Sequence, residues 1–211
     1  MLEILNSKGW IEFENVSCDD ELISIAQVYG QLKIHTNNNV IQILKPKDGL
    51  QAIKGTFSNL YGFGVFPYHT DVAFWAKPAH FMLLSSTNAN QCNTLVVSLT
   101  DIWDVLSEKD KQYFEKAIFV VKTIHSSFYS TLIFKEYGNI CIRYDPSCMI
   151  PINESAKRVI PILKNIFSEI QTHQIKWTGN KAVIINNWRT LHGRSSAEND
   201  LTRNLKRIYI I

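Results

Sequence analysis

The sequence contains no run of 18 or more apolar residues, so it predicts no transmembrane helix. Its N-terminus lacks a basic segment followed by an apolar one, so no secretory signal is expected. The net charge of the 211 residues is only +3, which gives no argument for a nucleic-acid partner. We therefore expect a cytoplasmic protein that binds neither membrane nor nucleic acid, and its oligomeric state stays open.

Cysteine is scarce and scattered, and no CxxC pair occurs among Cys18, Cys92, Cys141 and Cys148. Without an export signal, four reduced thiols are favoured over disulfides. The chain also lacks internal repeats, low-complexity segments and an evident linker. Its apolar fraction of 45% and charged fraction of 19% are those of an ordinary globular protein. The length then predicts one domain over residues 1–211.

Short alternating or apolar runs predict many strands and a few helices. Strands are expected at residues 10–14, 41–46, 80–86, 94–98, 117–121, 177–187 and 205–211, with a hairpin of 127–135 and 138–144. Helices are expected at 19–29, 101–116 and 153–172, and a loop at 51–65. This mixture predicts an α+β fold that is mainly β: a double-stranded β-helix (jelly roll) with flanking helices.

A candidate metal site begins in the segment 66–71, which contains His69-Thr70-Asp71. Alternate side chains of an extended strand share a face, so His69 and Asp71 are expected on one side. A second histidine, His192, would complete a 2-His-1-carboxylate set, which suits non-haem Fe(II) and leaves coordination positions open. The pattern His-x-Asp is common by chance, so this prediction depends on further positions. The histidines that match no ligand pattern are expected to be structural: His35, His80, His125 and His173.

Four segments resemble the taurine dioxygenase (TauD/TfdA) branch of the Fe(II)/2-oxoglutarate-dependent dioxygenases, which has a clavaminate synthase-like fold. They are 61–71, 93–95, 187–194 and 203–207. The resemblance is dense over 55–100 and 180–211, and the chain is short for the family. It implies that His69, Asp71 and His192 are the iron ligands. It also implies Fe(II) as the metal, 2-oxoglutarate as the co-substrate and O2 as the oxidant.

The co-substrate carboxylate far from the metal needs a cation, and arginine supplies a rigid two-pronged donor. Arg203 and Arg207 follow His192 by eleven and fifteen residues, and their spacing of four predicts that they share one face of the terminal strand. The resemblance implies that Arg203 holds this carboxylate with assistance from Thr94. Arg207 is then available for an anionic group of the prime substrate or for support of the site.

Three further positions complete the candidate site. Arg143 is a second candidate for binding an anionic group of the substrate, with an exposed hairpin charge as the alternative. Phe74 is a candidate wall of the substrate pocket, with an ordinary core position as the alternative. The polar residues beside the distal histidine are expected to fix its loop rather than to touch substrate. They are Asn187, Arg189 and Arg194.

Together these features predict a 2-oxoglutarate-dependent non-haem iron dioxygenase acting on a small amino-acid-like or carboxylate-bearing metabolite, as in specialised metabolism. Hydroxylation is the expected outcome, with desaturation or cyclisation as variants. Asp71 favours oxygenation, because related halogenases carry a small residue at this position. One alternative is a Zn2+-dependent hydrolase or isomerase, which leaves Arg203 and Thr94 unexplained. Others are a vestigial metal-binding protein and, more distantly, a nucleic-acid binder using the basic residues of 189–207.

Overall fold

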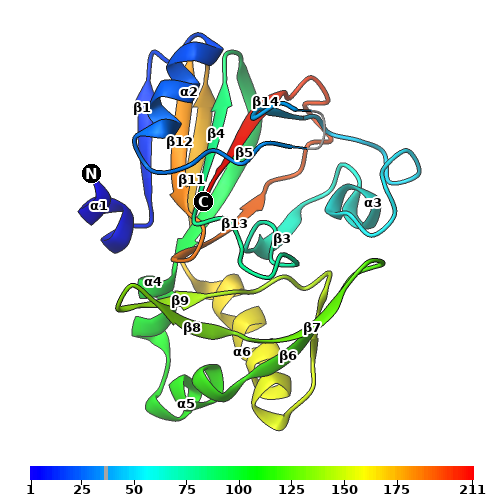
Figure 1. The fold of residues 1–211 in the computed structure, drawn as a ribbon. Helices are drawn as coiled ribbons and strands as arrows, with labels where there is room; N and C mark the ends of the chain where they lie inside the picture. The colour runs from blue at the N-terminus through cyan, green and yellow to red at the C-terminus, as the bar shows by residue number, and fades with distance from the viewer. Residues whose placement is uncertain (36–37) are drawn as a thin grey trace.

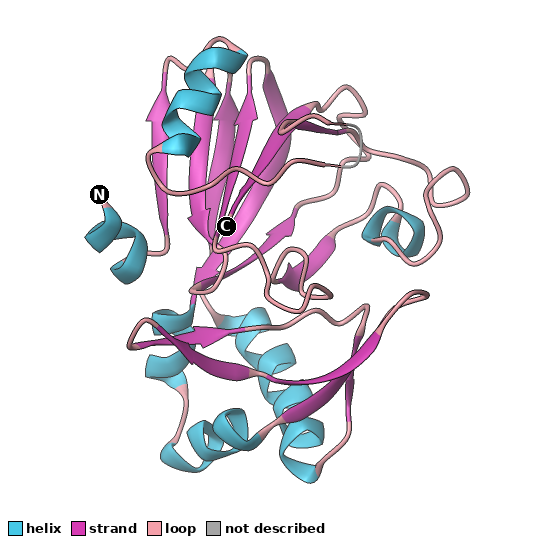
Figure 2. Cartoon of the chain, in the orientation of Figure 1, coloured by secondary structure: helices cyan, strands magenta, loops and turns pink. Residues whose placement is uncertain are grey.

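The structure is a computed structural model that describes residues 1–35 and 38–211 (Figure 1). Two β-sheets lie face to face in the upper part of the molecule, and the helices lie beside and below them (Figure 2). This arrangement agrees with the predicted double-stranded β-helix with flanking helices. No helix of the described residues is long and apolar enough to cross a membrane.

The larger sheet has five strands, in the order β1-β12-β4-β14-β2. Their bounds are β1 Trp10–Glu14, β12 Lys181–Asn186, β4 Phe81–Ser86, β14 Leu205–Ile210 and β2 Gln42–Leu44. Strands β4 and β12 are buried on both faces, which explains why their sequences are continuous apolar runs rather than alternating ones. In β12, Val183 and Ile185 face the inside of the barrel, while Ala182 and Ile184 face a helix outside.

The smaller sheet has four strands, in the order β11-β5-β13-β3. Their bounds are β11 His173–Thr178, β5 Ala89–Ser98, β13 Thr190–Arg194 and β3 Phe66–His69. Its inner face meets that of the larger sheet through a buried cluster that includes Trp10, Val96 and Trp177. Strands far apart in sequence therefore become neighbours around one interior.

Two helices lie outside the larger sheet. They are α1 Leu2–Ser7, which the sequence did not predict, and α2 Asp19–Gln27, which it did. Leu22 and Ala26 of α2 are buried against the outer side chains of the sheet. This cover closes the outer face, so the open side of the barrel lies elsewhere.

The segment between β5 and β11 forms the lower part of the molecule (Figure 1). Its elements are α4 Leu99–Val105, α5 Glu108–Lys116, β6 Ile118–Lys122, β7 Ser127–Thr131, β8 Ile133–Glu136, β9 Asn139–Ile142, β10 Met149–Pro151 and α6 Glu154–Glu169. They enclose a second apolar core that includes Phe114, Phe119 and Leu163.

Three local predictions were wrong. The expected loop at 51–65 contains a short helix, α3 Phe57–Tyr61, whose first turn is capped by the Thr56 side chain. The expected hairpin of 127–135 and 138–144 is only partly present, because β7 pairs with β6 while β8 and β9 form the hairpin. The expected helix at 101–116 is two helices, α4 and α5. All four cysteines are free thiols, as predicted.

Candidate metal centre

His69 and His192 face each other across two paired strands. His69 ends β3, His192 lies in the middle of β13, and the two residues are opposite partners in the antiparallel ladder. Their ring centroids are 4.2 Å apart. Gly193 permits this approach, since a Cβ at that position would lie 2.8 Å from the Phe66 carbonyl oxygen.

Asp71 lies close to the two histidines, as predicted, but strand geometry is not what positions it. Strand β3 ends at His69, so strand alternation does not position Asp71. The side chain of Asn187 does so instead. Its Oδ1 accepts a hydrogen bond from the Asp71 amide at 2.8 Å, and its Nδ2 donates to the Asp71 and Ala79 carbonyls at 3.0 and 2.9 Å. Asn187 therefore fixes the turn that follows the strand, rather than the loop of the distal histidine.

The Asp71 carboxylate forms a buried ion pair with Arg207. Arg207 Nη1 lies 2.6 Å from Asp71 Oδ2, and the Val72 amide donates to Oδ1 at 3.1 Å. Burial raises the pKa of Asp71, but the charge of Arg207, the largest opposing effect, holds this pKa below its usual value. Arg207 therefore stabilises the ionised carboxylate, which corresponds to the supporting role among the two predicted for it.

The residue types of the donor set suit a divalent metal. His69 Nδ1 lies 2.9 Å from the Pro67 carbonyl, an arrangement that leaves Nε2 free as a ligand atom. Burial, together with nearby His69, lowers the pKa of His192 to about 3, so this ring is neutral, as metal ligation requires. His192 Nδ1 is buried and has no hydrogen-bond partner among the described residues. Among the described residues, no group of three or more His, Cys, Asp and Glu side chains is placed so that it could hold a metal ion without rearrangement.

Aromatic side chains surround these groups. Phe57 of α3 packs on the His69 ring at 4.2 Å between centroids, so the helix missed by the sequence analysis walls the site. Trp75 packs edge-on against Tyr209 at 5.4 Å. Phe74, the predicted pocket wall, is 43% exposed, so it is not the ordinary core residue of the alternative prediction.

The residues predicted for the co-substrate lie further along the same interior. Arg203 precedes β14 rather than lying on it, so the argument that Arg203 and Arg207 share a strand face was wrong. Arg203 is nevertheless buried, and its Nε donates to the Cys92 carbonyl at 3.2 Å. Thr94 is also buried, and its hydroxyl accepts a hydrogen bond from Trp177 Nε1 at 3.2 Å.

Arg143 is not an exposed hairpin charge. Only 7% of the residue is exposed, and its guanidinium donates to Ser130 Oγ at 3.1 Å and to the Ala76 carbonyl at 2.9 Å. Asp145, two residues later, is also buried and was missed by the sequence analysis. The sequence did contain a signal that was not used: the residue before a proline favours extended backbone, so Asp145 before Pro146 could have been placed on the same face as Arg143.

The remaining predicted residues have structural contacts. Arg189 joins separate elements through the Asn6 and Ile140 carbonyls and Thr100 Oγ1. Arg194 donates to the carbonyls of Gly62 and Gly64, in the turn after α3. His80 is stacked between Phe81 and Trp188, each at 3.9 Å between centroids, in line with its expected structural role.

The chain is similar to several solved structures. An asparagine oxygenase in complex with Fe(II), 2S,3S-3-hydroxyasparagine and succinate superposes with a TM-score of 0.79 at 16% identity, covering 96% of this chain and 74% of that one. A putative alpha-ketoglutarate-dependent taurine dioxygenase from Burkholderia xenovorans gives 0.75 at 15% identity, covering 99% and 81%. PvcB from Pseudomonas aeruginosa gives 0.73 at 14% identity, covering 99% and 78%. At these identities the likeness shows the fold alone.

No curated protein matches the sequence. One family model matches residues 1–209, nearly the whole chain. This match confirms the predicted resemblance and the predicted enzyme class, a non-haem iron dioxygenase, and it gives no support to a zinc hydrolase or isomerase. The chain belongs to the taurine catabolism dioxygenase TauD, TfdA family.

Proposed function

We propose that the protein is an Fe(II)- and 2-oxoglutarate-dependent oxygenase that hydroxylates a small substrate carrying both an ammonium group and a carboxylate, such as an amino acid. One observation carries the choice of substrate. Arg143 and Asp145 are buried opposite charges, two residues apart, and neither is in an ion pair within the part of the chain that the structure describes.

In this proposal His69, Asp71 and His192 hold the metal, while Arg203 and Thr94 hold the far carboxylate of the co-substrate. Once bound, iron and 2-oxoglutarate supply the oxidation of a C–H bond with O2. The protein supplies position, a dry interior and charge. Phe57 and the buried inner faces of the two sheets exclude water from the histidines.

Asp145 is suited to an ammonium group. Its Oδ1 accepts hydrogen bonds from the amide and hydroxyl of Ser147 at 2.7 and 2.6 Å, and both donors are neutral. The negative charge of Asp145 also acts on two neighbouring side chains. Burial and then Asp145 raise the pKa of Tyr144 to about 12 and also raise the pKa of the Cys148 thiol. An uncompensated buried carboxylate costs on the order of several kcal/mol, which a bound cation would offset.

Arg143 is suited to a carboxylate. Its guanidinium lies near the rings of Phe128 and Phe134, and its Nε is buried without a hydrogen-bond partner among the described residues. Burial lowers the pKa of this arginine, the direction expected of a cation that lacks an acidic partner. A substrate carboxylate would provide the missing anion and accept the unused N–H group.

Both charges belong to the segment that runs beside the metal strand. The Thr70 amide donates to the Tyr144 carbonyl at 2.6 Å, and the Tyr144 amide donates to Thr70 Oγ1 at 3.1 Å. Thr70 separates His69 from Asp71 just as Tyr144 separates Arg143 from Asp145. This backbone contact brings the segment that carries Arg143 and Asp145 next to the segment that carries His69 and Asp71. The asparagine oxygenase among the similar structures, crystallised with a hydroxylated amino acid, supports the same substrate class.

The first test is anaerobic spectroscopy of the protein with Fe(II), followed by addition of 2-oxoglutarate. A weak visible charge-transfer band that appears only with both components is the expected result. Succinate release is then measured with L-amino acids and with their analogues lacking the amine or the carboxylate. Release that needs both groups supports the proposal. No band despite Fe(II) binding, or equal release with the analogues, would overturn the cofactor or the substrate assignment respectively.

A further inference from the structure

A third buried arginine, Arg194, lies close to the metal centre and has no role in the function proposed above. It follows His192 by two residues on β13, so both side chains share the inner face of the strand. Only 6% of Arg194 is exposed. A fully ionised side chain buried to this degree normally has an anionic partner, and no ion pair joins Arg194 to any acid among the described residues.

The contacts of Arg194 use only part of its guanidinium. Nη2 donates to the carbonyls of Gly62 and Gly64 at 2.9 and 2.6 Å, and the group stacks 3.5 Å from the centroid of the Phe66 ring. Nε is buried and has no partner in the part of the chain that the structure describes. Arginine has five N–H donors, so this side chain can hold the turn through one nitrogen and still bind an anion through others.

Arg194 lies beside the residues assigned to the co-substrate. It is the direct partner of Thr94 in the ladder between β13 and β5, so the two side chains are cross-strand neighbours on one face. The Arg203 guanidinium is close enough to interact electrostatically with Arg194. An anion that bound both guanidinium groups would offset the repulsion between these two buried cations.

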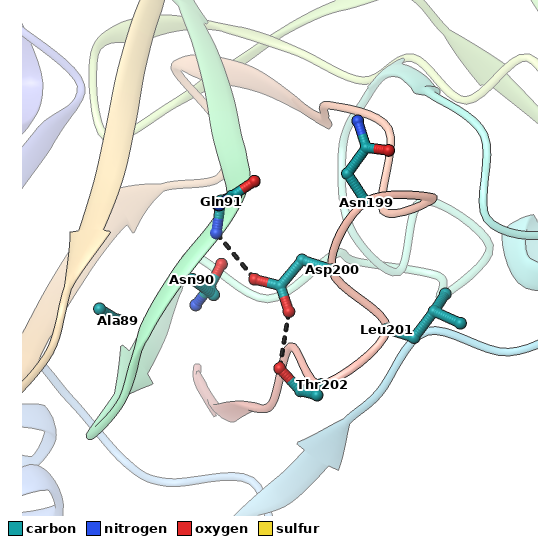
Figure 3. A pocket seen from close by; sticks show the side chains of 7 residues that line it. All are labelled: Ala89, Asn90, Gln91, Asn199, Asp200, Leu201 and Thr202. Atoms are coloured by element: carbon teal, nitrogen blue, oxygen red, sulfur yellow. Dashed lines mark hydrogen bonds between the residues drawn. The ribbon is translucent and has the colours of Figure 1, made fainter.

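The acid nearest to this cluster does not neutralise it. Asp200 contributes to the electrostatics of Arg203, but its carboxylate is held at the surface by the Gln91 amide at 2.8 Å and by Thr202 Oγ1 at 2.7 Å. Figure 3 shows these contacts at the edge of a surface hollow of about 500 Å³ between the start of β5 and residues 199–202. The Asp200 carboxylate is therefore held at the surface. The buried guanidinium groups of Arg194 and Arg203 form no ion pair with it.

We propose that Arg194 is the second cation of the co-substrate site, where it binds the far carboxylate of 2-oxoglutarate together with Arg203. This inference rests on the proposed function. Because the same guanidinium holds the Gly62 and Gly64 carbonyls, co-substrate binding also steadies the turn that follows α3. Phe57 of α3 packs on His69, so Arg194 would connect co-substrate binding with the helix that walls the site.

The test compares Arg194→Gln with a matched control, Arg189→Gln. Arg189 lies three residues before His192 and also donates to backbone carbonyls, but it is far from Thr94 in the ladder. The Fe(II)-loaded proteins are titrated anaerobically with 2-oxoglutarate and with 2-oxopentanoate, which has the same length but lacks the far carboxylate. Arg194→Gln should reduce the preference for 2-oxoglutarate over 2-oxopentanoate by roughly tenfold or more, the worth of one hydrogen bond to a charged group. Arg189→Gln should leave the preference unchanged.

A purely structural role predicts something different. In that case Arg194→Gln weakens both ligands equally, or neither, and the inference is overturned. Arg194→Lys, which keeps the charge without the fork, should recover part of the preference, and failure to recover any would count against an electrostatic role. Hydrogen exchange of residues 57–64 should slow on adding 2-oxoglutarate to the wild type but not to Arg194→Gln. If the wild type itself shows no preference between the two ligands, the proposed function fails and the inference with it.

Discussion

Arg207 Nη1 lies 2.6 Å from Asp71 Oδ2, and both side chains are more than four-fifths buried. Arg207 comes from the terminal strand β14, whereas Asp71 follows β3 of the opposite sheet. The pair therefore joins the two sheets at the proposed metal ligand. Gln42 completes the arrangement by accepting from Arg207 Nη2 at 2.6 Å. A divalent metal at Asp71 would bring a second positive charge to the same carboxylate.

Arg207→Met should destabilise the metal-free protein by about 3–5 kcal/mol, because it leaves the buried Asp71 carboxylate unpaired. Added Mn2+, a redox-inert probe, should raise the melting temperature of this variant more than that of the wild type. The reason is that the metal replaces the lost charge. Calorimetric melts with and without Mn2+ measure both effects. Gln42→Leu serves as the control, and an equal response of Arg207→Met and the wild type to Mn2+ would argue against metal binding at Asp71.

His69→Ala and Asp71→Ala should each abolish tight Fe(II) binding, since each removes one of three proposed ligands. Metal content after anaerobic loading and desalting is the measurement, and circular dichroism checks that the fold is retained. His173→Ala is a matched control, because that histidine lies on β11 and contacts Glu12 and Trp10 instead. Full iron loading of either ligand variant would show that the metal site is wrongly assigned.

Asp145→Asn should make the substrate-free protein more stable, by about 1 kcal/mol or more, since the substitution removes an unpaired buried charge. An asparagine Oδ1 can still accept the Ser147 hydrogen bonds. The same variant should raise the KM for an amino-acid substrate, because no carboxylate remains for its ammonium group. Thermal melts and succinate-release kinetics give the two results. A loss of stability in Asp145→Asn, with KM unchanged, would mean that the carboxylate is a structural group.

His80 should make stability depend on pH. Burial lowers the pKa of this histidine from 6.5 to about 4, so the unfolded chain takes up its proton first as the pH falls. The contribution of His80 to stability is therefore complete above pH 6.5 and is lost progressively down to about pH 4. His80→Phe, which keeps the stacking on Trp188, should flatten the decline in melting temperature over this range. Parallel curves for the wild type and the variant would contradict the assignment.

The sequence analysis was most successful where one physical rule determines the outcome. Continuous apolar runs predicted β4 and β12, because a strand that is buried on both faces is mostly apolar along its whole length. It failed where a side chain from a distant segment decides the local conformation. Asp71 is positioned by Asn187 rather than by strand alternation, and α3 lies in a stretch whose glycines indicated a loop. Asp145 was missed because its proposed role depends on its being buried without a cationic partner among the described residues, which a sequence does not show.

The contacts of Asn187 also bear on when the protein can take up metal. They join Asn187 to Asp71 across 116 residues of chain. His69 and Asp71 leave the ribosome long before Asn187, His192 and Arg207, so a nascent chain lacks both the second imidazole and the groups that orient the carboxylate. Long-range pairings of this kind form late in folding. With His69, Asp71 and His192 as the proposed ligands, we expect iron uptake to follow synthesis of the C-terminal strands and unfinished chains to lack an assembled metal site.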